Sequence, residues 1–560
     1  MNTGRWVPFL LAVASAAETP KTIVDLQDFR QTSSQQVRSG SGREGVATLI
    51  NLNPAIGAWY LLSVAWKDGT AQSPWHLENP KPHAAAILLD AGYPAGLVIA
   101  EGTSRFSCDL FSELEQGRNS PLIYYPLCGA RLYLRNVAKG RRTALEAAAE
   151  FLRNQVWGGE KVVVMFHHLL ADRYRETGEV VNRSRDAAAA PAGQPLPALI
   201  DPASTNRLIM PGELGITLDE HAAGTEGMAP GAWYPAADNP GIYVSLVQPD
   251  YIAPEILRSY KTIVNNPDSI EASSLCYLIA FDLDRLEPGF ALGTDYPGVG
   301  WSEHLNPQMR DPDLPGPDGI GSIAPLISTG LLSPENGRRT VATFTGGFKR
   351  THGAFRYGVL ALKNHGSHYG FIENGVVFSK LQPGLATIFT PEDGSLEMKT
   401  WAEADNRLLP KIRFARQNGV PLIESGVPGA LVGRWGQGNW SGSEDEKLRT
   451  IRAGAAMQIS HGRRFLIYAV FSDATPSAMA RVFQAYRCDY AMLLDMNALE
   501  HTYLALYRRK GSEMSVEHLL KGMSQLDKSA SGEVVPRFLG SPDNRDFFYV
   551  MRRDAKERKP

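Results

Sequence analysis

Four polar residues that follow an apolar run supply groups suited to proton transfer. The run begins at Tyr490, and the sequence then changes to Asp495, Asn497, Glu500 and His501. Carboxylates and a histidine this close together can donate, accept or relay a proton. The alternative is structural, because an Asp at the end of a strand often caps the turn that follows it.

A glycine-containing turn upstream offers a place for an anion. The segment TFTGGFKRTH contains Thr345, Gly346, Gly347, Lys349 and His352. Two adjacent glycines let a ligand approach the main chain closely, and the basic residues supply positive charge. The GxxxxGK[ST] spacing of a phosphate-binding P-loop is absent from the sequence. A tight hairpin with solvated basic side chains is the alternative.

Further histidines and arginines complete the candidate set. His365 and His368 flank Gly366, which places them in a loop or hairpin, and His368 is a candidate catalytic histidine. A metal site would need a third ligand, and no metal-ligand spacing is present. Arg449 and Arg452 precede a run of small residues, where a guanidinium group can bind phosphate or carboxylate in a bidentate manner. Either arginine could instead be an ordinary surface charge.

A strand, a helix and a second strand are expected to position Asp495. Residues 464–471 and 490–495 are apolar runs of the kind found in strands buried on both faces. Between them Thr475 can cap a helix with Pro476 in its first turn. The apolar residues at helical spacing are Met479, Val482, Phe483 and Tyr486. The pattern predicts a βαβ unit with a parallel strand pair, and ligands of such sheets bind beyond the carboxyl ends of the strands.

Length and charge exclude several classes of partner. The chain has 560 residues, which is enough for two or three domains with substantial cores. Its formal net charge of -2 gives no electrostatic footprint for nucleic acid or an anionic membrane. No stretch approaches the ~18 apolar residues that a membrane span needs, so we expect no integral membrane segment.

The first residues have the pattern of an export signal. Arg5 precedes an apolar stretch from Trp6 to Val13, and residues 14–16 provide small side chains in an A-x-A arrangement. This predicts a signal peptide over residues 1–17 and a secreted or periplasmic protein. A frayed, uncleaved N-terminus is the alternative.

The cysteines leave the redox state open. Four are present, at positions 108, 128, 276 and 488, without a CxxC or a metal-ligand spacing. Cys108 and Cys128 lie in one N-terminal region and could pair in an oxidising compartment, whereas buried free thiols are the alternative.

Composition along the chain suggests several units. Residues 18–183 contain closely spaced apolar runs and one capped helix, which predicts a β-rich N-terminal module. Residues 184–239 are rich in Ala, Gly and Pro and read as linker and irregular chain. Residues 240–515 form the second domain and residues 516–560 a C-terminal extension. The predicted fold class is α+β or mixed α/β, with a mixed sheet and the βαβ unit in the second domain.

The order of these motifs resembles that of the phosphodiester glycosidase family over roughly residues 240–510. The corresponding segments are TGGF at 345–348, VPGALVG at 427–433, RAGAA at 452–456 and LLDMNALEH at 493–501. The family Asn is Thr345 here, and the family's glycine-rich turn after Asp495 is replaced by Met496, Asn497 and Ala498. Larger side chains at that turn reshape any pocket built on it.

The resemblance implies hydrolysis of a sugar 1-phosphodiester or related glycoside, with a carbohydrate or sugar-phosphate ligand and no cofactor or metal. Asp495 would activate water or stabilise the anomeric centre, with Glu500 or His501 as its proton-transfer partner. Cations would stabilise charge on the departing phosphate. The candidates for that role are Lys349, His352, His368 and Arg452. The other residues expected at the substrate are Thr345, Gly346, Gly347 and Asn497.

Two other classes of protein fit the same residues. A non-catalytic, exported carbohydrate-binding or cell-envelope protein with this fold would explain the loss of the glycine turn. A metal-dependent phosphoesterase would require at least three convergent His or carboxylate ligands.

Overall fold

The structure is a computed structural model, and it describes fourteen stretches of the chain. These are residues 22–39, 41–70, 74–90, 96–107, 110–141, 179–182, 193–219, 227–294, 322, 324–346, 370–433, 449–511, 513–527 and 532–553. Several sequence predictions fall outside them. These concern the signal peptide at 1–17, the capped helix after Thr143, and the residues Gly347, Lys349, His352, His365 and His368.

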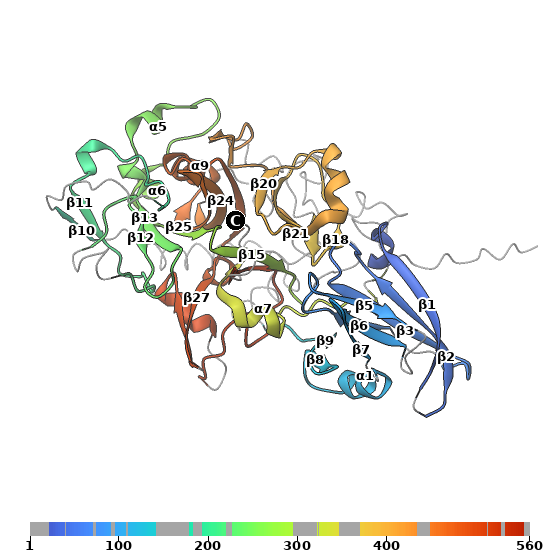
Figure 1. Cartoon of the computed structure of the whole chain (residues 1–560). Coiled ribbons are helices and arrows are strands. Elements are labelled where there is room, and N and C mark those ends of the chain that lie inside the picture. The colour runs from blue at the N-terminus through green and yellow to red at the C-terminus, as the bar shows by residue number, and fades with distance from the viewer. Residues whose placement is uncertain are drawn as a thin grey trace, which may run out of the picture.

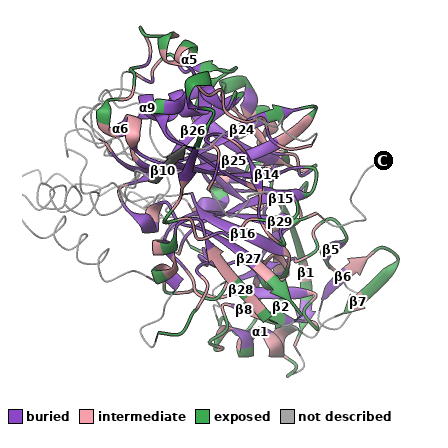
Figure 2. Cartoon of the chain, turned by 90° about the vertical axis from the view of Figure 1, so that its left-hand side faces the viewer, coloured by how far each residue is buried: buried purple, intermediate pink, exposed green. Residues whose placement is uncertain are grey.

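Two sheets form the centre of the molecule and share one hydrophobic core (Figure 1). The first has eight strands, in the order β12 (Tyr234–Pro235), β13 (Ile242–Val247), β14 (Cys276–Asp282), β25 (Arg463–Ala474), β24 (Thr450–Ser460), β26 (Tyr490–Met496), β22 (Ile423–Glu424) and β23 (Val427–Pro428). The second has five, in the order β15 (Leu286–Ala291), β29 (Phe547–Arg552), β16 (Thr340–Thr345), β27 (Leu504–Lys510) and β28 (Glu513–His518). Their strands are mostly buried (Figure 2).

Helix α9 (Pro476–Ala485) covers the other face of the eight-stranded sheet. It forms as the sequence predicts, with Pro476 in its first turn and the Thr475 hydroxyl accepting a hydrogen bond from the main-chain N–H of Ala478 at 3.3 Å. Val482 and Phe483 pack with Phe471 of β25 in a second core. The sheet is therefore buried on both sides, which accounts for its continuous apolar runs.

The predicted α+β or mixed α/β fold class is wrong, because the structure is mostly β and every ladder between its named strands is antiparallel. β25 and β26 do run in the same direction on either side of α9. However, β24 lies between them and pairs with both in the antiparallel sense. Continuous apolar runs indicate strands that are buried on both faces, which is typical of parallel sheets. Here an antiparallel sheet is buried on both faces by a helix and a second sheet, so it has the same apolar runs.

The remaining strands form four smaller sheets. The N-terminal sheet contains β1 (Gln31–Arg38), β2 (Glu44–Asn51), β3 (Trp59–Trp66), β4 (Trp75–Glu78), β9 (Leu132–Arg135) and β8 (Tyr124–Leu127). Beside it stand β5 (Ala85–Leu89), β6 (Leu97–Glu101) and β7 (Ser104–Ser107). A further sheet contains β18 (Val376–Ser379), β17 (Phe371–Glu373), β21 (Ile412–Gln417), β19 (Ala386–Pro391) and β20 (Glu397–Thr400). The last pairs β10 (Glu179–Asn182) with β11 (Arg207–Met210).

Helices are short in the described residues, and none is long and apolar enough to cross a membrane. The α-helices besides α9 are α1 (Leu110–Arg118), α5 (Pro254–Arg258), α6 (Ser269–Ser273) and α7 (Pro334–Arg339). The 3-10 helices are η1 (Ile23–Leu26), η2 (Pro202–Ser204), η3 (Pro249–Tyr251), η6 (Glu403–Lys411), η8 (Leu499–His501) and η9 (Lys521–Asp527). Cys128 is disulfide-bonded, Cys276 and Cys488 are buried free thiols, and Cys108 lies outside the described residues.

The N-terminal sheet joins the rest of the chain through buried aromatic and amide side chains. Trp59 of β3 packs edge-on against Phe378 of β18 at 5.9 Å between ring centroids. The Gln27 amide donates to the carbonyl of Val377 at 2.7 Å and accepts from its N–H at 2.9 Å. The same amide donates to the carbonyl of Ile23 at 2.8 Å. A single side chain thus takes the place of a strand partner at the edge of β18.

We expect Gln27→Ala to lower the free energy of unfolding by about 1–3 kcal/mol, because it leaves both main-chain groups of Val377 without their partner. Gln36→Ala is the matched control, since Gln36 is exposed on β1. Thermal and urea unfolding of the purified variants measure the effect. Equal unfolding midpoints for the two variants would show that water replaces the amide at no cost.

Candidate active site

A β-bulge near the end of β26 directs Asp495 toward the space between the two central sheets. On β24, Gly454 pairs with Leu493 and Arg452 pairs with Met496, so two steps on β24 span three on β26. The Asn418 amide donates to the carbonyls of Leu493 at 2.8 Å and Leu494 at 2.7 Å, which satisfies main-chain groups at the irregularity. Met496 then faces the core under α9, and Asp495 faces the other way.

The Asp495 carboxyl is buried, with 1% of the residue exposed. Its Oδ1 accepts a hydrogen bond from the N–H of Met496 at 2.7 Å, and its Oδ2 lies 3.5 Å from Nη1 of Arg545. Burial raises the pKa of Asp495 to about 8, and the positive charge of Arg545 opposes that rise. At neutral pH this carboxyl is therefore mostly protonated.

A second carboxyl, that of Asp546, lies beside it. Asp546 accepts a hydrogen bond from Nε of Arg416 at 2.6 Å, and both side chains are fully buried. The charge of Asp546 raises the pKa of Asp495 and that of Arg416 lowers it, so the pair acts directly on the first carboxyl. Each carboxyl of the cluster therefore has a guanidinium group beside it, Arg416 for Asp546 and Arg545 for Asp495.

Gly346 brings the end of β16 against this ion pair. Its N–H donates to the main-chain carbonyl of Asp546 at 3.0 Å. A Cβ at this position would lie 2.9 Å from Oδ2 of Asp546 and 3.2 Å from Nε of Arg416. The preceding Thr345 is buried, and its hydroxyl donates to the carbonyl of His501 at 2.8 Å. The predicted turn therefore contacts the carboxyl cluster through main-chain atoms.

His501 is the member of the cluster that reaches solvent, with 15% of its side chain exposed. Its Nδ1 lies 2.7 Å from the carbonyl oxygen of Met496, and this nitrogen must donate because a carbonyl only accepts. The same nitrogen is 4.0 Å from Oδ1 of Asp495. The main chain thus fixes the ring beside Asp495 and leaves Nε2 as the nitrogen for proton exchange.

A shell of charged groups holds the segment that carries Arg545 and Asp546. Nε of Arg537 donates to Oδ2 of Asp543 at 2.6 Å, and its Nη1 donates to the carbonyl of Glu500 at 2.7 Å. The N–H of Arg545 donates to Oδ1 of Asp543 at 2.9 Å. Glu500 itself is buried and enters this shell through its main chain. The shell links the segment before β29 to the turn after β26.

Arg449 and Arg452, the other arginine candidates, lie apart from this cluster. Arg452 is fully buried, and its guanidinium donates to the carbonyl of Ala474 and to Sδ of Met496, each at 2.6 Å, on the α9 side of the sheet. Arg449 pairs with Asp268 at 3.3 Å. Gly347, Lys349, His352 and His368 lie outside the described residues. Within the part of the chain that the structure describes, no three His, Cys, Asp or Glu side chains group as a metal site.

Sequence patterns did not single out Arg416, Arg545 or Asp546. Arg416 lies inside the buried strand β21, and a buried arginine needs partners for its N–H groups, but the sequence does not indicate which residue supplies them. Arg545 and Asp546 end the polar run SPDNRD directly before the apolar strand β29. A charged run against a strand is ambiguous by itself, because most such runs are solvated turns.

Comparison with known proteins finds similarity among solved structures and not among sequences. No protein-family model matches this sequence, and no curated protein matches it. Among solved structures the chain is similar to the zebrafish N-acetylglucosamine-1-phosphodiester alpha-N-acetylglucosaminidase catalytic domain auto-inhibited by its pro-peptide. The match has 10% sequence identity, covers 65% of this chain and 96% of that chain, and has a TM-score of 0.30. The relationship is at most distant and assigns no activity to this chain.

Asn497 adopts a left-handed conformation with φ of 82° in the turn after Asp495. Asn tolerates this region better than residues with larger or branched side chains, and Gly adopts it freely. We expect Asn497→Ala to lower the free energy of unfolding by about 1 kcal/mol and Asn497→Gly to leave it unchanged or raise it. Urea unfolding of both variants measures this. Identical midpoints for Ala and Gly would show that the turn relaxes.

Proposed function

We propose that this chain is a hydrolase acting on a sugar 1-phosphodiester or a related glycoside. The observation that carries the proposal is the pair of neighbouring buried carboxyls, Asp495 with a pKa raised to about 8 and Asp546 at 2.6 Å from Nε of Arg416. Two neighbouring carboxyls in different environments can supply the acid and the base that glycoside hydrolysis requires.

Asp495 is the proposed general acid. Its protonated carboxyl donates a hydrogen bond, and then the proton, to the oxygen that leaves the anomeric carbon. Asp546 is the proposed base or nucleophile, because it forms an ion pair with Arg416. His501, whose side chain is 15% exposed, is the proposed relay: Nε2 takes up a proton from solvent, and Nδ1, which lies 4.0 Å from Oδ1 of Asp495, gives up its own proton to that carboxyl.

The charge of the cluster favours an anionic substrate. Arg416 and Arg545 place two guanidinium groups beside Asp546 and Asp495. A guanidinium group beside the acid can stabilise the phosphate oxygen as the glycosidic bond breaks. A phosphate is a good leaving group, so Arg545 beside the acid reduces the demand on proton transfer.

Two expectations from the sequence join this proposal. The order of the TGGF, VPGALVG, RAGAA and LLDMNALEH segments resembles the phosphodiester glycosidase family, which favours a sugar 1-phosphodiester over other glycosides. The signal-like residues 1–17 favour a secreted or periplasmic hydrolase.

We expect activity to fall as the pH rises through about 8, because Asp495 loses the proton that it donates. Activity should fall rather than rise with pH because the protonated, active form of Asp495 dominates below its pKa and the inactive carboxylate dominates above it. Asp495→Asn should lower kcat by about 10²- to 10⁴-fold and abolish the alkaline limb. Rates on an aryl phosphodiester of N-acetylglucosamine, measured from pH 5 to 10, test both outcomes.

Asp546→Asn should lower kcat by a similar factor. The fall of the rate above about pH 8 in the pH–rate profile should remain, since Asp495 is still present. Asp489→Asn is the control for both variants, because Asp489 is an exposed carboxyl just before the start of β26. A folded wild type that hydrolyses neither this substrate nor a panel of sugar phosphodiesters would overturn the proposal. Binding of these sugars without turnover would instead support a non-catalytic carbohydrate-binding protein.

A further inference from the structure

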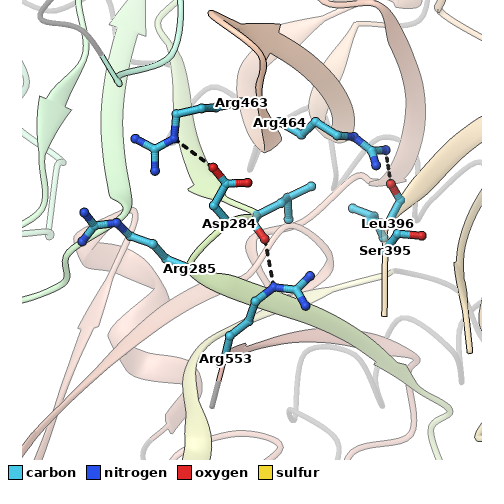
Figure 3. A pocket seen from close by; sticks show the side chains of 8 residues that line it. Asp284, Arg285, Ser395, Leu396, Arg463, Arg464 and Arg553 are labelled. Carbon is cyan, nitrogen blue, oxygen red and sulfur yellow. Dashed lines mark hydrogen bonds and ion pairs between the residues drawn. The ribbon is translucent and has the colours of Figure 1, made fainter. Parts of the chain in front are cut away.

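A cavity of about 600 Å³ lies at the far end of the eight-stranded sheet from Asp495 (Figure 3). Four of its lining residues are arginines, one is an acid, and the others are two leucines and a serine. The lining residues are Leu283, Asp284, Arg285, Ser395, Leu396, Arg463, Arg464 and Arg553. Its wall therefore carries an excess of guanidinium groups.

The strand register separates this cavity from the carboxyl cluster. Arg463, at the start of β25, pairs with Ser460 at the end of β24. Arg452, near the start of β24, pairs with Met496 of β26, which is next to Asp495. The eight residue-to-residue steps from Arg452 to Ser460 span about 26 Å at ~3.3 Å per step. The two sites lie at opposite ends of β24.

Acidic partners hold two of the arginines in place. Nε of Arg463 donates to Asp284 at 3.1 Å, and the same guanidinium contacts the buried carboxyl of Asp282. Nη1 of Arg464 pairs with Glu397 at 3.0 Å, and its Nη2 donates to the carbonyl of Leu396. Fixed guanidinium groups of this kind lose little freedom when a ligand binds.

The other two arginines present charge that carboxylates do not neutralise as fully. Arg553 donates from Nε to the carbonyl of Leu283 at 2.9 Å and from Nη2 to the carbonyl of Gly394 at 3.0 Å. Among the described residues, the hydrogen-bond partners of the Arg553 side chain are these two main-chain carbonyls and no carboxylate. Half of the Arg285 side chain is exposed, and its Nε is 3.6 Å from Asp282. Main-chain carbonyls thus orient Arg553 without cancelling its charge.

We propose that this cavity binds a phosphorylated sugar, with Arg553 on the phosphate and Arg285, whose side chain points away from Arg553 (Figure 3), adding positive charge at the edge of the cavity. Guanidinium groups suit phosphate because their paired N–H donors match its oxygens. The volume exceeds what a single phosphate fills and lies in the range of small-molecule sites. No aromatic side chain is among the lining residues described, so a nucleobase would find no ring on which to stack, whereas sugar hydroxyls can bond Asp284 and Ser395.

Calorimetric titration of the full chain with glucose 6-phosphate, inorganic phosphate, AMP and glucose at one ionic strength tests this. We expect glucose 6-phosphate to bind more tightly than inorganic phosphate or AMP, and glucose not to bind. Arg553→Gln should weaken binding by at least tenfold, and Arg285→Gln, which removes positive charge at the edge of the cavity, should weaken it severalfold.

Arg38→Gln is the matched control, since Arg38 is an exposed, ion-paired arginine on the N-terminal sheet. Arg285 is half exposed, so its variant keeps the test valid if Arg553→Gln fails to fold. Unchanged affinity in folded Arg285→Gln, or no binding of glucose 6-phosphate by wild type at 10 mM, would overturn the proposal. Asp495→Asn should bind as wild type does, which separates this site from the proposed hydrolase site.

Discussion

Burial of charge between two apolar sheets is the constraint on which the candidate site depends. Arg416 and Asp546 are fully buried, and Asp495 and Arg545 nearly so, in a layer built mainly from aromatic and aliphatic side chains. Removing each ion from water costs several kcal/mol, so every charge there requires a partner or must become neutral. Asp546 meets this requirement through its ion pair and Asp495 through protonation. The different environments of the two carboxyls are thus a product of packing.

The irregularities in the strands that pair with β24 fix the position of Asp495 in this buried layer. Its neighbours β25 and β26 each contain an extra residue at the level of Arg452. The Arg452 guanidinium ties the two strand ends together by bonding Ala474 of one and Met496 of the other, and burial lowers its pKa to about 9. A bulge alone would leave Asp495 on a loose strand end. Anchored on the opposite face, the strand holds the carboxyl toward the second sheet.

Sequence patterns predicted the local elements better than their assembly. The strand, capped helix and strand around Thr475 form as expected, because cap chemistry and apolar spacing are local properties. The parallel pairing failed, because apolar runs do not reveal that β24 would insert between the two strands. Thr345, Gly346, Asp495 and His501 do converge. Arg416 and Asp546 stand 130 residues apart, and nothing in the sequence indicates that they meet.

Because Asp495 is buried, its pKa should also depend on whether a charged ligand is bound beside it. A phosphodiester bound beside Arg545 would add a negative charge near a carboxyl that already lies in an apolar layer. A nearby like charge disfavours ionisation, and exclusion of water strengthens that effect. The pKa of Asp495 in the substrate complex should therefore lie above its value in the free protein. An acid prepared in this way stays protonated until the leaving oxygen accepts its proton, and the alkaline limb of kcat lies at higher pH than that of kcat/KM.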